Sequence, residues 1–140
     1  MKKGRVATGA VLVALTALVV LATSRANSQD TGATVKPVRA EKLANAPGQT
    51  LTVVTVSYAP GAKSTVHRHA GSVFAYVLSG AIRSENSATG PVKVYKAGES
   101  FFEPAQSRHL VSENASTTEP ATMLVIFVAE DGAQLTTFDK

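Results

Sequence analysis

The chain has 140 residues, with 14 Lys and Arg against 10 Asp and Glu, and it contains no cysteine. A length of this order predicts a single domain. The lack of cysteine excludes disulfides, thiolate ligands and lipid attachment through a thiol, so any bound metal must be held by nitrogen or oxygen atoms.

Residues 1–26 are predicted to form a secretory signal peptide. The chain starts with a cluster of positive charge formed by Lys2, Lys3 and Arg5. Apolar and small residues then fill 6–22, and small residues precede the cleavage site. Cleavage there predicts a bacterial protein that is periplasmic or secreted. The alternative is an uncleaved N-terminal anchor, which is the one case in which we expect contact with a membrane.

The net charge of +4 arises from the predicted signal peptide. Four of the 14 basic residues precede the cleavage site and none of the 10 acidic residues does, so the mature chain has 10 of each. A nucleic-acid-binding function, which needs a basic surface, is therefore set aside.

The segment after the signal peptide, residues 27–45, is predicted to be a linker and N-terminal arm. Polar and small residues dominate 27–35, as in solvated linkers. Residues 40–46 are compatible with one helical turn, which Pro47 and Gly48 would end.

The remaining sequence predicts one all-β domain over residues 46–135. Short runs of β-branched and aromatic residues alternate with Gly, Pro and Asn turns, and no sustained helical period is present. The expected strands lie at 49–58, 73–78, 81–85, 92–95, 100–103, 109–112 and 123–128. Strands of this length and spacing are typical of a sandwich or barrel. The strand 73–78 is apolar on both faces, so we expect it between the barrel interior and a second layer.

The stretch VHRHAGSVFAYVLSG holds two of the three histidines. In a strand, His67 and His69 point to one side and Arg68 to the other. Two imidazoles on one face can bind a divalent ion when another strand supplies a third ligand, for which His109 is the remaining histidine. Three neutral imidazoles suit zinc, iron, manganese, copper or nickel. The alternative is that these residues are satisfied core histidines or surface residues of an edge strand.

Two stretches resemble the conserved motifs of the cupins. PGAKSTVHRHAGSVFAYVLSG is similar to the first: Gly, five residues, His-x-His, three or four residues, Glu, six residues and Gly. GESFFEPAQSRHLVSEN is similar to the second: Gly, five residues, Pro-x-Gly, two residues, His, three residues and Asn. The resemblance covers residues 61–114 and implies a cupin-type β-barrel, a double-sheet jelly roll. It also implies a divalent metal, Fe, Mn or Zn, held by His67, His69 and His109.

Three positions depart from these motifs. Val73 stands where the family has a glutamate that is normally a fourth ligand. Gln106 replaces the second glycine of the second motif, and Glu113 replaces its asparagine, with Asn114 one residue later. Losing the charged ligand predicts a stronger Lewis acid that binds its metal less tightly.

Glu103 is the candidate for a replacement carboxylate. It precedes Pro104, on the strand that leads to His109. If it faces inward, we expect it to be a fourth ligand or a catalytic general base. The alternative is a strand-end glutamate in solvent. The neighbouring charged residues are expected outside the site: Arg68, Glu99, Arg108 and Glu113.

We consider two classes of function for the domain, of which the resemblance implies the first. The first is a metal-dependent enzyme that acts on a small organic substrate by dioxygenation or isomerisation. The second is a non-catalytic module outside the cytoplasm that binds or senses a small ligand or a metal, which the missing motif glutamate favours. A degenerate barrel that acts through oligomer contacts is a third reading. The expected partners are a small molecule and a second copy in a homodimer, with the apolar strand 123–128 as one candidate contact.

Overall fold

The computed structural model describes residues 32–139 as ten β-strands and connecting turns. The strands are β1 (Ala33–Lys42), β2 (Gln49–Tyr58), β3 (His67–His69), β4 (Ser72–Ser79), β5 (Ala81–Asn86), β6 (Gly90–Lys96), β7 (Ser100–Glu103), β8 (Arg108–Asn114), β9 (Ala121–Glu130) and β10 (Thr136–Phe138). Among these described residues there is no helix with the length and hydropathy needed to cross a membrane.

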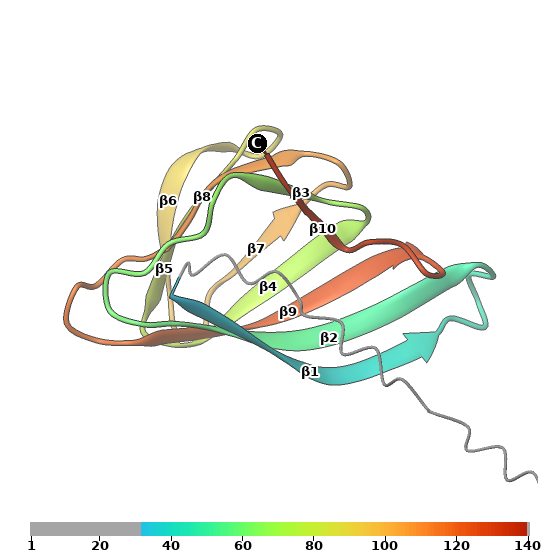
Figure 1. Cartoon of the computed structure of the whole chain (residues 1–140), viewed down its shortest axis with the longest axis horizontal. Coiled ribbons are helices and arrows are strands. Elements are labelled where there is room, and N and C mark those ends of the chain that lie inside the picture. The colour runs from blue at the N-terminus through green and yellow to red at the C-terminus, as the bar shows by residue number, and fades with distance from the viewer. Residues whose placement is uncertain (1–31, 140) are drawn as a thin grey trace, which may run out of the picture.

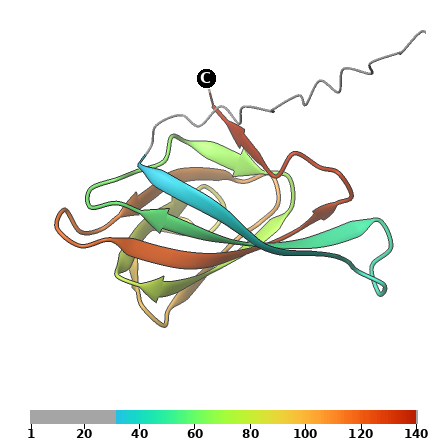
Figure 2. The ribbon, with the colours of Figure 1, turned by 60° about the horizontal axis from the view of Figure 1, so that its bottom comes forward.

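The strands form two five-stranded sheets that face each other (Figures 1 and 2). The order in sheet A is β1-β2-β9-β4-β7, and the order in sheet B is β10-β3-β8-β5-β6. Every pairing between these strands is antiparallel. The predicted all-β, double-sheet jelly roll is therefore confirmed.

The longest inner pairing, between β2 and β9, shows why these residues form a sheet. It runs in unbroken register from Gln49 opposite Glu130 to Tyr58 opposite Ala121. Both strands are rich in β-branched residues, and alternate side chains enter the space between the sheets. The inward side chains are buried and make up much of the core: Val54, Tyr58, Met123, Val125 and Phe127.

Strand β4 has one face buried in the core and one face exposed on the outside of sheet A. Val73, Ala75 and Val77 point inward and are at most 1% exposed. Their neighbours on the other face are well exposed: Phe74, Tyr76 and Leu78. The prediction of a second layer over this face is wrong for the described part of the chain, because no described element lies over it and the apolar face meets solvent.

The N-terminal arm carries a strand. β1 pairs with β2 along its whole length, with a bulge between Pro37 and Arg39. The helical turn predicted over 40–46 is wrong, because its first residues end β1. A hydrogen-bonded turn follows instead, in which Leu43 N donates to Gln49 O over 2.9 Å. The predicted signal peptide lies outside the described residues.

The C-terminal strand β10 lies beside β3, where it extends sheet B (Figure 1). Its three residues pair with His67, Arg68 and His69. This pairing places the end of the described chain next to two of the three histidines.

Candidate metal centre

The three histidines converge on one position between the sheets. His67 and His69 on β3 are 6% and 7% exposed, and Arg68 between them points outward. His109 on β8 lies directly opposite His67 in the antiparallel pairing, so it points to the same side. Each of the three residues offers a ring nitrogen, and these nitrogens all lie within 4.8 Å of one another. The predicted convergence is therefore confirmed.

Backbone carbonyls set the tautomer of the two histidines on β3. His67 Nδ1 lies 2.7 Å from the carbonyl of Thr65, and His69 Nδ1 lies 3.1 Å from that of Leu135. Because a carbonyl can only accept, Nδ1 carries the proton in each ring. Each Nε2 therefore keeps a free lone pair, as ligation through that atom requires.

His109 contains the one buried side-chain nitrogen that lacks a hydrogen bond among the described residues. Its Nε2 is 2.8 Å from Ser84 Oγ. Its Nδ1 lies 3.1 Å from Glu103 Oε2 but makes no hydrogen bond. Buried polar atoms are rarely left without a partner. Three buried imidazoles that each offer a nitrogen within 4.8 Å of the others form a donor set that fits a divalent metal.

Burial keeps the histidine pair neutral. Loss of solvation lowers the pKa of His67 to about 4, and the hydrogen bond to Thr65 offsets only part of this effect. Loss of solvation also lowers the pKa of His69. Neutral imidazole is the form that binds metal, so protons do not compete for these two rings near neutral pH.

Glu103 faces inward and is 2% exposed, so the solvent-exposed alternative is wrong. On its own, burial raises the pKa of this carboxyl, but the nearby imidazoles, His109 first, lower it below its ordinary value. Asn86 Nδ2 donates a hydrogen bond of 3.2 Å to Oε2. Glu103 is not one of the residues whose ligand atoms all lie within 4.8 Å of one another, which are the three histidines.

The strand register relates Glu103 to the missing motif glutamate. Glu103 on β7 lies directly opposite Val73 on β4. Opposite residues of an antiparallel pair point to the same face, and both side chains are buried. The Glu103 carboxylate therefore lies on the strand next to Val73, the position at which the motif has its glutamate.

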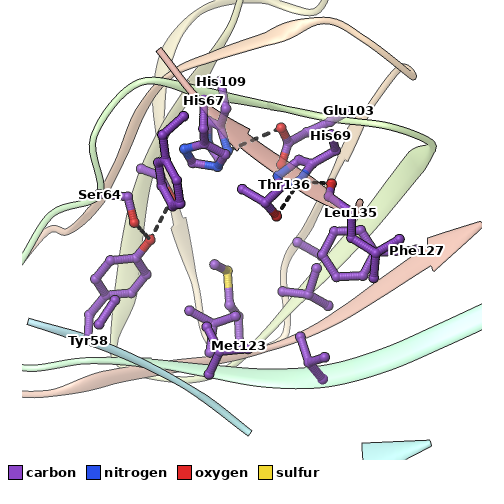
Figure 3. Close-up of a pocket in the computed structure, with 18 residues that line it drawn as sticks. Tyr58, Ser64, His67, His69, Glu103, His109, Met123, Phe127, Leu135 and Thr136 are labelled. Carbon is purple, nitrogen blue, oxygen red and sulfur yellow. Dashed lines mark hydrogen bonds and ion pairs between the residues drawn. The ribbon is translucent and has the colours of Figure 1, made fainter. Parts of the chain in front are cut away.

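The histidines and Glu103 line one side of a cavity of about 460 Å³ (Figure 3). Most of the remaining wall is apolar: Val54, Val56, Met123, Val125, Phe127 and Phe138. A second polar group is formed by Tyr58, whose hydroxyl lies 2.7 Å from Ser64 Oγ and 2.8 Å from Ser112 Oγ. These hydroxyls were not predicted. The spacing of Val54, Val56 and Tyr58, two residues apart in each step, places all three on the inward face of β2 and could have identified the tyrosine.

The charged neighbours lie outside the site, as predicted. Arg68 and Arg108 are opposite each other in the β3–β8 pairing and point outward. Glu113 pairs with Arg83, and the exposed Glu99 accepts a hydrogen bond of 2.6 Å from Lys96 N.

Two of the motif departures have a clear structural counterpart. Gln106 has a φ of 63°, the left-handed conformation for which the glycine of the motif is suited. Asn114 is 5% exposed, and its amide donates to the carbonyls of Ala59 and Glu119 over 3.1 and 2.7 Å. Asn114, and not Glu113, therefore provides the buried amide at the end of β8.

The Cupin domain family model matches residues 54–127, which is over half of the chain. No curated protein sequence matches. A chain from the crystal structures of the DMSP lyases RdDddP and RnDddQII is 22% identical, with a TM-score of 0.55 and coverage of 64% of this chain and 44% of that chain.

Two further solved structures show the same likeness. Oxalate oxidase in complex with the substrate analogue glycolate is 24% identical, with a TM-score of 0.60 and coverage of 79% of this chain and 57% of that chain. An uncharacterized conserved protein with a double-stranded β-helix domain from Klebsiella pneumoniae is 20% identical, with a TM-score of 0.61 and coverage of 79% and 87%. At these identities the likeness concerns the fold. The chain spans about half the length of the lyase and oxidase chains.

Proposed function

This chain belongs to the cupin domain family, and on that premise we propose that it binds one divalent metal ion through His67, His69 and His109 and acts on a small organic substrate. One observation carries the proposal: three buried imidazoles bring their nitrogens within 4.8 Å of one another at the wall of a 460 Å³ cavity. Iron, manganese and zinc are the candidate metals. Dioxygenation or isomerisation are the candidate reactions.

Glu103 is the group we assign as general base. It is buried on the cavity wall, its lowered pKa keeps it ionised near neutral pH, and Asn86 holds one of its oxygens. When bound, a divalent ion would supply Lewis-acid polarisation of the substrate oxygens. Glu103 would then accept a proton from a substrate carbon or hydroxyl beside the histidines. The apolar wall excludes water and strengthens these polar contacts.

A non-catalytic role as a small-ligand or metal-binding module is the second candidate. The observation that favours it is the buried Val73, an apolar residue at the position of the motif glutamate. A site that held only the three histidines and no acting carboxylate would bind an ion or ligand without turnover.

Export from the cytoplasm is part of the proposal, and it is supported by the sequence of residues 1–26 alone. N-terminal sequencing of the protein recovered from the periplasm or medium would test it, and an intact N-terminus in a membrane fraction would favour the anchor. The homodimer stays a prediction that sedimentation of the mature protein would test.

The deciding experiment is elemental analysis of the purified protein beside a His67→Ala variant. We expect about one ion per wild-type chain and at least a tenfold loss in the variant, since removing one of three ligands leaves an incomplete site. Lys93→Ala, an exposed change on β6, is the control and should keep its metal. Absence of metal from the wild-type protein after incubation with Fe²⁺, Mn²⁺ and Zn²⁺ would refute the site.

Turnover assays then separate the two functions. The metal-loaded protein is incubated under air with catechol-like and keto-acid substrates. Product formation that is lost in His67→Ala supports the enzyme. Stoichiometric metal without turnover on any substrate supports the binding module.

A further inference from the structure

The two arginines that flank the histidines share one carboxylate. Arg68 Nη2 lies 2.9 Å from Asp139 Oδ1, while Arg108 Nε and Nη2 lie 2.9 and 2.6 Å from Asp139 Oδ2. Both arginines point outward from directly opposite positions on β3 and β8, so their side chains meet above the sheet. Only 19% of the Asp139 side chain is exposed. Three charge-assisted bonds therefore end on one carboxylate.

Asp139 closes a short segment, residues 135–139, which we call the C-terminal strap. The strap lies along β3, with Thr136 opposite His69 and Phe138 opposite His67. Its ends are held by two backbone hydrogen bonds, from Ala70 N to Leu135 O over 3.2 Å and from Asp139 N to Val66 O over 2.9 Å. A short edge segment with only three paired residues frays unless further contacts hold it.

The strap contacts the metal centre directly. His69 Nδ1 lies 3.1 Å from both Leu135 O and Thr136 Oγ1 (Figure 3). The Phe138 ring centroid is 5.5 Å from that of His67. Leu135, Thr136 and Phe138 all line the cavity. The tautomer of His69 and one part of the cavity wall therefore depend on where the strap lies.

We propose that the Arg68–Asp139–Arg108 cluster fastens the C-terminal strap, and that the strap in turn positions His69 for metal binding. The three charged residues are not among those that line the cavity, so we assign them as positioning residues. Their effect on metal affinity rests on the proposed metal site, whereas their effect on the strap does not.

An isolated surface ion pair would contribute little. This cluster differs because β3, β8 and the strap meet in it. The carboxylate is bound by guanidinium groups from β3 and β8, which carry the histidines on their opposite faces. Removing its charge would release the only side-chain ion pairs that the described residues of the strap make.

The test compares Asp139→Asn with a matched control, Asp131→Asn. Asp131 is another aspartate in an ion pair near the C-terminal end of the described chain. Its partners are Lys42 and Thr50 on β1 and β2, in sheet A, whereas the strap extends sheet B. Hydrogen exchange of the metal-free proteins is followed in peptides covering 66–70 and 134–139. We expect about tenfold faster exchange at the strap amides in Asp139→Asn and no change in Asp131→Asn.

Two further readouts address His69. Nitrogen-15 NMR of the metal-free protein should show Nδ1 of His69 protonated in the wild type and a mixture of tautomers in Asp139→Asn. Titration with Co²⁺ should give about threefold to tenfold weaker binding in Asp139→Asn, by analogy with the loss of other groups that orient metal ligands. Asp139→Glu keeps the negative charge, so it should largely retain the wild-type exchange rate, His69 tautomer and Co²⁺ affinity.

Each result decides the matter. Unchanged exchange in Asp139→Asn would overturn the role of the cluster as a fastener. Faster exchange with an unchanged His69 tautomer and unchanged Co²⁺ affinity would overturn the positioning role. If wild type binds no Co²⁺, the proposed metal function fails, and the exchange and tautomer measurements still judge the strap.

Discussion

At the scale of single residues, the consequential change is the position of a carboxylate. Val73 and Glu103 are opposite each other on β4 and β7, and both point into the core. An apolar side chain therefore fills the motif position, and the charge stands on the neighbouring strand beside His109. Glu103 Oε2 lies 3.1 Å from His109 Nδ1, and the role that we propose for it is that of a general base.

Glu103→Gln tests that role. The amide keeps the shape of the side chain but cannot accept a proton as a base, so we expect turnover to fall about a hundredfold. Metal affinity should stay within about twofold, because the three imidazoles remain. Glu113→Gln, at the surface pair with Arg83, is the control. A loss of metal affinity comparable to that of His67→Ala would instead identify Glu103 as a ligand.

Residue spacing made part of this site predictable. The alternation His-Arg-His predicted which side chains of β3 face inward, because strand periodicity is local. The meeting of His67 with His109 depends on the pairing of β3 with β8. No local pattern specifies that pairing, so here the motif resemblance was needed. The outward residue Arg68 was placed correctly, but its partner Asp139 lies 71 positions away in sequence and could not be inferred.

At the scale of elements, a strand is predictable where turn residues border it and a run of β-branched or aromatic residues fills it. β2 and β7 have the bounds predicted from sequence, because turn residues border each of them on both sides. β1 was not predicted, since Pro37 interrupts it and its polar and apolar residues show no regular alternation along its whole length. β10 is only three residues long, which is too short for a period to show. It exists because β3 offers an unpaired edge.

The turn between β7 and β8 provides a test of backbone strain. Gln106 adopts a φ of 63°, which costs a residue with a Cβ more than it costs glycine. Gln106→Gly should therefore raise the free energy of unfolding by about 0.5–1 kcal/mol. The gain is limited by the hydrogen bond from Gln106 Nε2 to Ala70 O, which is lost. Chemical denaturation would measure the change, with Gln134→Gly as an exposed control that should not stabilise. A decrease in stability would show that the bond outweighs the strain.

At the scale of the whole molecule, the fold stabilises the metal-binding form of its histidines before any metal arrives. The neutral rings of His67 and His69 lie between sheets that no disulfide links. The core must therefore supply the free energy that keeps them buried and uncharged. Low pH lowers the free energy of unfolding, because histidines in the unfolded chain can bind protons that the buried rings cannot.

The metal-free protein should consequently lose stability between pH 6.5 and about 4. The pKa of His67 is near 6.5 when unfolded and about 4 when folded, so over that range the unfolded state binds the additional proton. The free energy of unfolding should fall by roughly 3 kcal/mol for this group as the pH drops, since each pKa unit corresponds to about 1.4 kcal/mol. Burial of His69 acts in the same direction. From about pH 4.5 downward, protonation of Glu103 removes further stability, because the folded state holds the pKa of this carboxyl below its unfolded value of 4.5.

Urea denaturation in the presence of a chelator, repeated from pH 7 to pH 4, measures this loss. His67→Gln serves as the comparison, because it removes one titrating ring while keeping a polar side chain of similar length. Its stability should depend less on pH over the same range. A wild-type free energy of unfolding that is flat from pH 6.5 to 5 would mean that these rings are not held neutral by burial, and the metal-ready state of the site would then need another explanation.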